Sequence, residues 1–137
     1  MLYRVMDKRE LPALVRAFME SYEVVAPVKR GSGYVFDVIG SPDEIELGST
    51  QTDSSPKKYL MPPTETLMRF DAQMNLVEDF TEQVTPRVVF GVHTCDINAM
   101  NRLDIALIEG KYVDPYYQAR RDATMIVGIS CVPGDNC

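Results

Sequence analysis

Residues 87–109, "RVVFGVHTCDINAMNRLDIALIE", decide the fold that we predict for this chain. The run "RVVFGV" (87–92) follows a proline and is almost continuously apolar, which is typical of a strand buried on both faces of a sheet. Asp96 then stands at a position suited to a helix N-cap. Behind it, four apolar residues recur at the spacing of one helical face: Ile97, Met100, Leu103 and Leu107. The stretch therefore predicts a buried strand followed by an amphipathic helix.

A second apolar run of strand length, "TMIVGIS" (124–130), follows this helix. Before it, "DPYYQARR" predicts a short helix, with Asp114 as its cap and Pro115 at its first position. A strand, about 30 residues that contain helix, and a second strand form a βαβ unit, in which the two strands run parallel. The C-terminal half is therefore predicted to be α/β, with both strands buried.

The N-terminal half adds a helix and a hairpin. Apolar residues at helical spacing predict a helix over about residues 8–20. Two β-rich runs flank the segment 30–33, Arg-Gly-Ser-Gly, which predicts a β-hairpin with a glycine-containing loop. The polar stretch 48–58 has the composition of an exposed loop. Residues 1–137 are thus expected to form a single α/β domain.

The charge balance and the apolar pattern exclude two classes of protein. The chain has 14 Lys and Arg against 20 Asp and Glu, and its basic residues fall in scattered pairs. Nucleic-acid binders instead carry a clustered positive surface, so we expect no nucleic-acid partner. No apolar stretch approaches the roughly 20 residues of a membrane span, and the first ten residues lack a signal-peptide centre. A cytoplasmic protein without a membrane span is therefore expected.

The three cysteines are the candidate functional residues. Cys95 and Cys131 each follow a predicted strand, and parallel strands end at the same edge of a sheet, where α/β proteins bind their ligands. The start of a helix also favours the thiolate form of Cys95. Pro133 and Gly134 can turn the chain so that Cys137 approaches the other two sulfurs. Three converging thiolates suit an iron–sulfur cluster or zinc.

Other interpretations of these residues remain open. Free cysteines are often small buried hydrophobic residues, so Cys95 and Cys131 are equally compatible with packing. His93 is expected to be a loop residue hydrogen-bonded to backbone, with metal ligation as the alternative. No serine and aspartate accompany this histidine in a pattern that supports triad chemistry.

Three motifs, in this order, resemble a known family. They are "SPKKYLMPPTETLMRF" (55–70), "FGVHTCDINAMNRLD" (90–104) and "YVDPYYQARRDATMIVGISC" (112–131). Together they resemble the N-terminal portion of the β subunit of soluble NiFe hydrogenases (sulfhydrogenases) and of the related iron–sulfur subunit of anaerobic sulfite reductase. These are iron–sulfur proteins of the 4Fe-4S dicluster type, and the likeness covers most of the chain beyond residue 55.

The resemblance implies a non-catalytic electron-transfer subunit that links a flavin-bearing, NAD(P)-linked subunit to a hydrogenase or sulfite reductase catalytic subunit. It also implies that Cys95, Cys131 and Cys137 bind a [4Fe-4S] cluster, with a fourth ligand from elsewhere or from His93. Family members are longer and carry ferredoxin-like cysteine runs that do not occur in this sequence. The chain is therefore expected to be the N-terminal part of a longer iron–sulfur protein.

Two other functions stay open. The same sheet edge suits a nucleotide- or flavin-binding module, although "GVHTCD" (91–96) lacks the small residues that let backbone approach a pyrophosphate, and Asp96 would repel one. The chain is also compatible with a scaffold that docks partner subunits and binds no cofactor. Thermal stability that does not change with iron would favour the scaffold.

Overall fold

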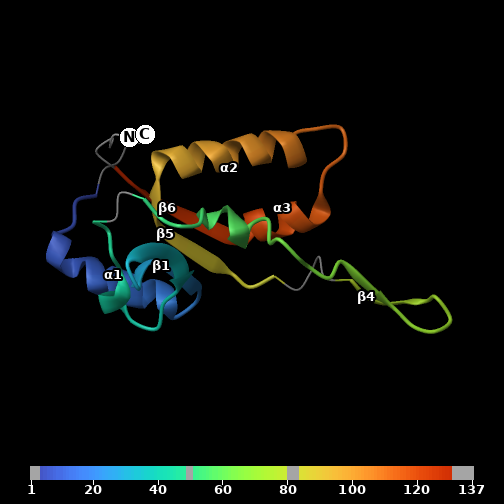
Figure 1. Ribbon diagram of the computed structural model, residues 1–137, viewed down its shortest axis with the longest axis horizontal. Coiled ribbons are helices and arrows are strands. Elements are labelled where there is room, and N and C mark those ends of the chain that lie inside the picture. Colours follow the sequence, from blue (N-terminus) through green and yellow to red (C-terminus); the bar gives the residue numbers. More distant parts are fainter. Residues whose placement is uncertain (1–3, 49–50, 80–83, 131–137) are drawn as a thin grey trace.

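The computed structural model describes residues 4–48, 51–79 and 84–130 and is built around a four-stranded sheet (Figure 1). The strands lie in the order β2-β1-β5-β6. Their bounds are β1 Glu23–Arg30, β2 Gly33–Val38, β5 Arg87–His93 and β6 Thr124–Ile129. β1 pairs with β2 antiparallel and with β5 parallel, and β5 pairs with β6 parallel. The predicted α/β class and its parallel C-terminal strands are confirmed.

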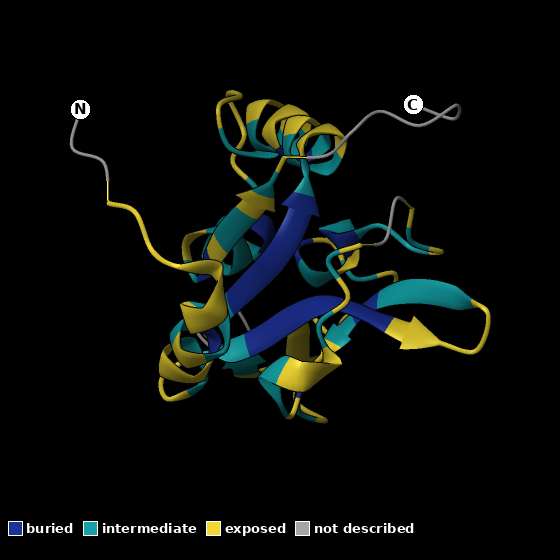
Figure 2. Ribbon diagram, turned by 90° about the vertical axis from the view of Figure 1, so that its left-hand side faces the viewer, coloured by how far each residue is buried: buried dark blue, intermediate teal, exposed yellow. Residues whose placement is uncertain are grey.

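Helices cover both faces of the sheet. On one face, α1 (Leu11–Met19) follows a 3-10 helix at Lys8–Glu10 and packs on a core that includes Val15, Val24 and Val88. On the other face lie α2 (Thr94–Leu107) and α3 (Pro115–Asp122). Their core includes Met100, Tyr117 and Val89. The two central strands, β1 and β5, are buried because each supplies side chains to both cores (Figure 2).

Several local predictions are confirmed. The helix expected over 8–20 forms as the 3-10 turn and α1. Arg30 pairs with Gly33 across a two-residue hairpin turn, and Gly31 has a φ of 61°, a left-handed conformation that glycine adopts without a steric cost. Asp114 caps α3 by accepting hydrogen bonds of 2.9 Å from the N–H groups of Tyr116 and Tyr117.

Two predictions about the C-terminal half are wrong. β6 is an edge strand, and only Thr124 of its six residues is buried, so the run 124–130 is not buried on both faces. Asp96 is not the N-cap of the following helix. That helix begins at Thr94, its N-cap is His93, and no side chain caps it. The apolar face of the helix is as predicted, because Met100 is buried and Ile97, Leu103 and Leu107 pack against the same core.

A second hairpin, which the sequence did not predict, extends from the body of the molecule (Figure 1). It consists of β3 (Met68–Phe70) and β4 (Leu76–Asp79), paired antiparallel in a separate two-stranded sheet. Two further 3-10 helices, η2 (Pro42–Glu44) and η3 (Pro56–Tyr59), lie in the connections. Among the described helices, none is long and apolar enough to cross a membrane.

Candidate functional site

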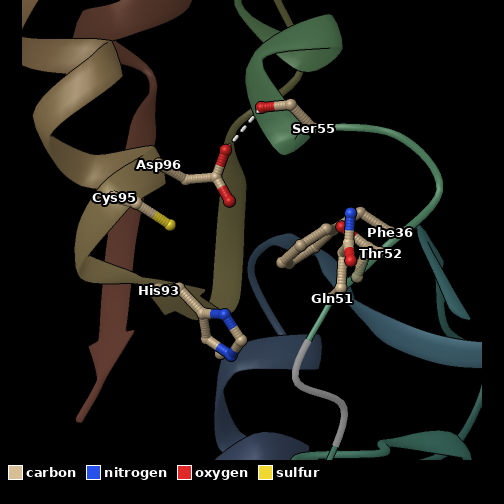
Figure 3. A pocket seen from close by; sticks show the side chains of 8 residues that line it. Phe36, Gln51, Thr52, Ser55, His93, Cys95 and Asp96 are labelled. Atoms are coloured by element: carbon tan, nitrogen blue, oxygen red, sulfur yellow. Dashed lines mark hydrogen bonds between the residues drawn. The ribbon is translucent and has the colours of Figure 1, made fainter. Parts of the chain in front are cut away.

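A cavity of about 140 Å³ lies at the carboxyl end of β5. One wall is the end of β5 and the first turn of α2, and it contains Gly91, His93, Cys95 and Asp96. The facing wall contains Phe36 of β2 with Gln51, Thr52 and Ser55 (Figure 3). The site is therefore built from segments that are about 40 residues apart in the sequence.

Gly91 shapes the first wall. It has a φ of 79°, and the pairing of β5 with β6 shifts between Phe90 and Val92. Side chains of a regular strand alternate between faces, so Phe90 and Val92 should share one. Phe90 instead packs in the α1 core and Val92 in the α2 core. This bulge thus reverses the alternation just before the strand reaches His93 and Cys95, a use of bulges that is common beside functional sites.

Glycine is also required at position 91 for lack of space. A Cβ atom there would lie 2.9 Å from Leu47 Cδ2 and 3.1 Å from Pro27 Cδ. The left-handed backbone would strain any other L-residue as well. The sequence analysis did not identify this residue, although a glycine inside an apolar strand is a signal for a bulge.

Cys95 is the second residue of α2, and its side chain is a free thiol that is exposed. The sulfur points into the cavity, toward the wall formed by Phe36 and Thr52 (Figure 3). The expectation that this cysteine stands at the start of a helix, at the carboxyl end of a parallel strand, is confirmed. Its exposure contradicts the alternative that it is a buried packing residue.

His93 occupies the same wall but differs from its prediction. It is the last residue of β5 and not a loop residue, and its ring lines the cavity. The ring makes no hydrogen bond with any residue that the structure describes, so the expected bond to backbone is wrong. His93 therefore offers a ring nitrogen at the cavity without a competing partner in the described chain.

Asp96 is committed to a contact across the cavity. The hydroxyl of Ser55 donates a hydrogen bond of 2.6 Å to Asp96 Oδ1 (Figure 3). Both side chains are partly buried. The carboxylate is thus used between segments and not within its own helix, which is the reason that the N-cap prediction fails. The contact also makes 48–58 more than an exposed loop, because Pro56 within it is buried.

The other two candidate cysteines, Cys131 and Cys137, lie outside the described residues. Parallel pairing of β5 with β6 continues as far as His93 and Ile129, so the two strands end at one edge as predicted. The convergence of three sulfurs at that edge stays a prediction. Within residues 4–48, 51–79 and 84–130, no group of three or more His, Cys, Asp or Glu side chains could hold a metal ion.

Comparison with known proteins gives one informative relationship. No protein-family model matches the chain, and no solved structure matches it. Sulfhydrogenase 2 subunit beta of Pyrococcus furiosus is 35% identical to it over 137 residues. The match covers 100% of this chain and 40% of that subunit. The resemblance expected from the three motifs is therefore confirmed: the chain spans two fifths of a sulfhydrogenase beta subunit, to which it is similar along its whole length.

Proposed function

We propose that this chain is part of an electron-transfer subunit, in which Cys95 is a ligand of an iron–sulfur cluster at the carboxyl edge of the sheet. The observation that carries the proposal is the exposed Cys95 sulfur, which points into a cavity at the end of a central parallel strand. The similarity to a sulfhydrogenase beta subunit supports the same function.

The donor chemistry of the cavity fits one corner of such a cluster. Iron–sulfur clusters are held by cysteine thiolates, commonly four. Among the described residues, the cavity supplies one thiol, Cys95. The proposal therefore requires the sulfurs of Cys131 and Cys137. It also requires a fourth ligand, which His93 or another polypeptide would provide. The shared edge of β5 and β6 favours the approach of Cys131, because Ile129 is paired with His93.

The cluster, when bound, supplies one-electron transfer, and the protein's own residues hold and tune it. Hydrogen bonds to the sulfurs and exclusion of water set the potential of such a centre. Phe36 and Gly91 provide apolar surface in the cavity wall, and Thr52 and Gln51 provide hydrogen-bonding groups. We further propose that the protein passes electrons between the flavoprotein and catalytic subunits of an oxidoreductase, either a hydrogenase or a sulfite reductase. No residue is assigned a catalytic role.

A nucleotide- or flavin-binding function is less well supported. Pockets for ligands of that size usually enclose about 300–1,000 Å³, whereas this cavity is about 140 Å³. The Asp96 carboxylate lines it, and a negative charge there would oppose a phosphate group.

Anaerobic reconstitution with iron and sulfide tests the proposal. We expect the chain to take up both and to show the absorption and EPR signals of a cluster, and Cys95→Ser to lose most of the bound iron. Asn98→Ser is the matched control, because Asn98 is an exposed residue of the same helix. Iron and sulfide uptake by Cys95→Ser equal to that of the unaltered chain would refute the proposal. Stability that is unchanged by iron in all three proteins would favour the docking scaffold.

A further inference from the structure

Residues 51–56, which we call the strap, face Cys95 across the cavity. Gln51, Thr52 and Ser55 of the strap line the wall opposite the cysteine (Figure 3). The backbone N–H of Asp53 donates a hydrogen bond of 2.7 Å to the carbonyl of Tyr34, which joins the strap to β2. At its other end, Pro56 is buried and begins η3. The strap is therefore attached to the sheet on the side away from Cys95.

A single side-chain hydrogen bond joins the described strap to α2, the helix that carries the cysteine. It is the 2.6 Å bond from Ser55 Oγ to Asp96 Oδ1. A hydroxyl-to-carboxylate bond of this length is of the strong, charge-assisted kind. Ser55 is held for this role because its oxygen also accepts from the N–H of Lys57 at the start of η3. Asp96, adjacent to Cys95, thus links the strap to the turn that bears the sulfur.

We propose that Ser55 and Asp96 are positioning residues, and that their hydrogen bond, the tether, holds the strap as the outer wall of the Cys95 cavity and limits the size of the molecules that reach the sulfur. The inference rests on the proposed function for its meaning, because a wall beside a ligand sulfur limits the access of oxidants and chelators to the metal. Its geometry does not depend on the metal. Without the tether, the strap keeps its attachment to β2 but loses its hydrogen bond to α2.

The size of reagent that modifies Cys95 tests this wall directly. In the iron-free chain, we would measure alkylation of Cys95 by iodoacetamide and by a bulky maleimide, using mass spectrometry of the Cys95 peptide so that Cys131 and Cys137 do not contribute. Loss of a bond to a charged group changes an opening equilibrium by roughly tenfold. We therefore expect Ser55→Ala to raise the maleimide rate by roughly that factor and the iodoacetamide rate by less.

Two serine variants make the comparison specific. Ser55→Thr keeps the hydroxyl and should retain the ratio of the two rates found in the unaltered chain. Ser41→Ala is the matched control, because Ser41 also caps a 3-10 helix and also precedes a proline, but its contacts are with Asp43 and Glu44. An unchanged ratio in Ser55→Ala, or an equal change in Ser41→Ala, would overturn the proposal.

Asp96→Ala provides a second route to the same answer if Ser55→Ala folds poorly. Removing the acceptor should raise the ratio as much as removing the donor, and the double variant should add no further change, since both break one interaction. Additive effects would contradict the tether.

The iron-loaded chain separates this inference from the proposed function. If a cluster forms, Ser55→Ala should lose iron to a chelator faster than Ser41→Ala does, and equal rates would count against the tether. If no cluster forms in any variant, the proposed function fails, while the alkylation ratio still decides whether the tether exists.

Discussion

The hydroxyl of Tyr117 donates a hydrogen bond of 2.7 Å to Asp104 Oδ1, and this contact joins α3 to α2. Tyr117 is fully buried, and Arg121 pairs with the same carboxylate at 3.1 Å. The helices on the Cys95 side of the sheet therefore share a polar contact in addition to their apolar core. Because α2 carries Cys95 at its other end, this contact supports the helix that forms the site.

Tyr117→Phe should destabilise the fold. The substitution keeps the ring but removes a hydrogen bond to a carboxylate, so we expect the free energy of unfolding to fall by about 1.5–3 kcal/mol in urea denaturation. Tyr112→Phe is the control, because Tyr112 is 81% exposed. Equal effects of the two substitutions would show that the buried hydrogen bond contributes nothing.

The same residue predicts how stability depends on pH. Burial, and then the hydrogen bond to Asp104, raise the pKa of Tyr117 above its ordinary value. The folded state thus holds the phenol proton more tightly than the unfolded state does. The resulting stability is complete below about pH 10, the unfolded value for tyrosine, and is lost as the pH rises further. Burial also raises the pKa of Tyr59. Tyr117→Phe should therefore flatten, but not abolish, the alkaline fall in the unfolding free energy.

The glycines at 91 and 128 should respond differently to alanine. Gly91→Ala places a Cβ on a left-handed backbone and against Leu47 and the rigid ring of Pro27, so we expect a loss of about 1–3 kcal/mol. Gly128→Ala meets only the end of the flexible Ile97 side chain within 3.4 Å, at 2.6 Å. It should cost less. Equal midpoints of urea unfolding for the two variants would contradict the role of the bulge.

Met100→Ala tests the core beneath α2. Met100 is 1% exposed and belongs to the core that includes Val89 and Val92. Truncating a buried methionine leaves a cavity, so the free energy of unfolding should fall by about 2–5 kcal/mol. Ile105→Ala, on the same helix at 55% exposure, should cost well under half as much. Thermal or urea denaturation of the pair would reveal a wrong assignment of the buried face as a reversed order of stabilities.

Asp114→Ala should weaken the start of α3. It removes the acceptor for two backbone N–H groups, a change that costs about 0.5–2 kcal/mol at a helix N-terminus. Asp114→Asn keeps an acceptor oxygen and should retain most of the stability. If both variants unfold at the same urea concentration, the charge and not the cap is the source of the effect.

Local sequence patterns determined the elements that support the site. The apolar run before Cys95, the helical spacing behind it, and the Asp114-Pro115 start of α3 each depend on residues within a few positions of one another. Backbone sterics, capping and one-sided burial act over that range, so these elements were predictable. The position of Cys95 at the junction of strand and helix followed from them.

Only the tertiary structure decided how distant segments meet. β1 pairs in parallel with β5, although about 60 residues separate them, and β6 becomes an edge strand. Asp96 bonds to Ser55, 41 residues away, in place of its own helix N-terminus. Gly91 takes a left-handed conformation because Leu47 and Pro27 leave no room for a side chain. Each outcome depends on which surfaces pack together. A local pattern records a residue's preference for strand or helix, whereas its partner is chosen by the packing of the whole chain.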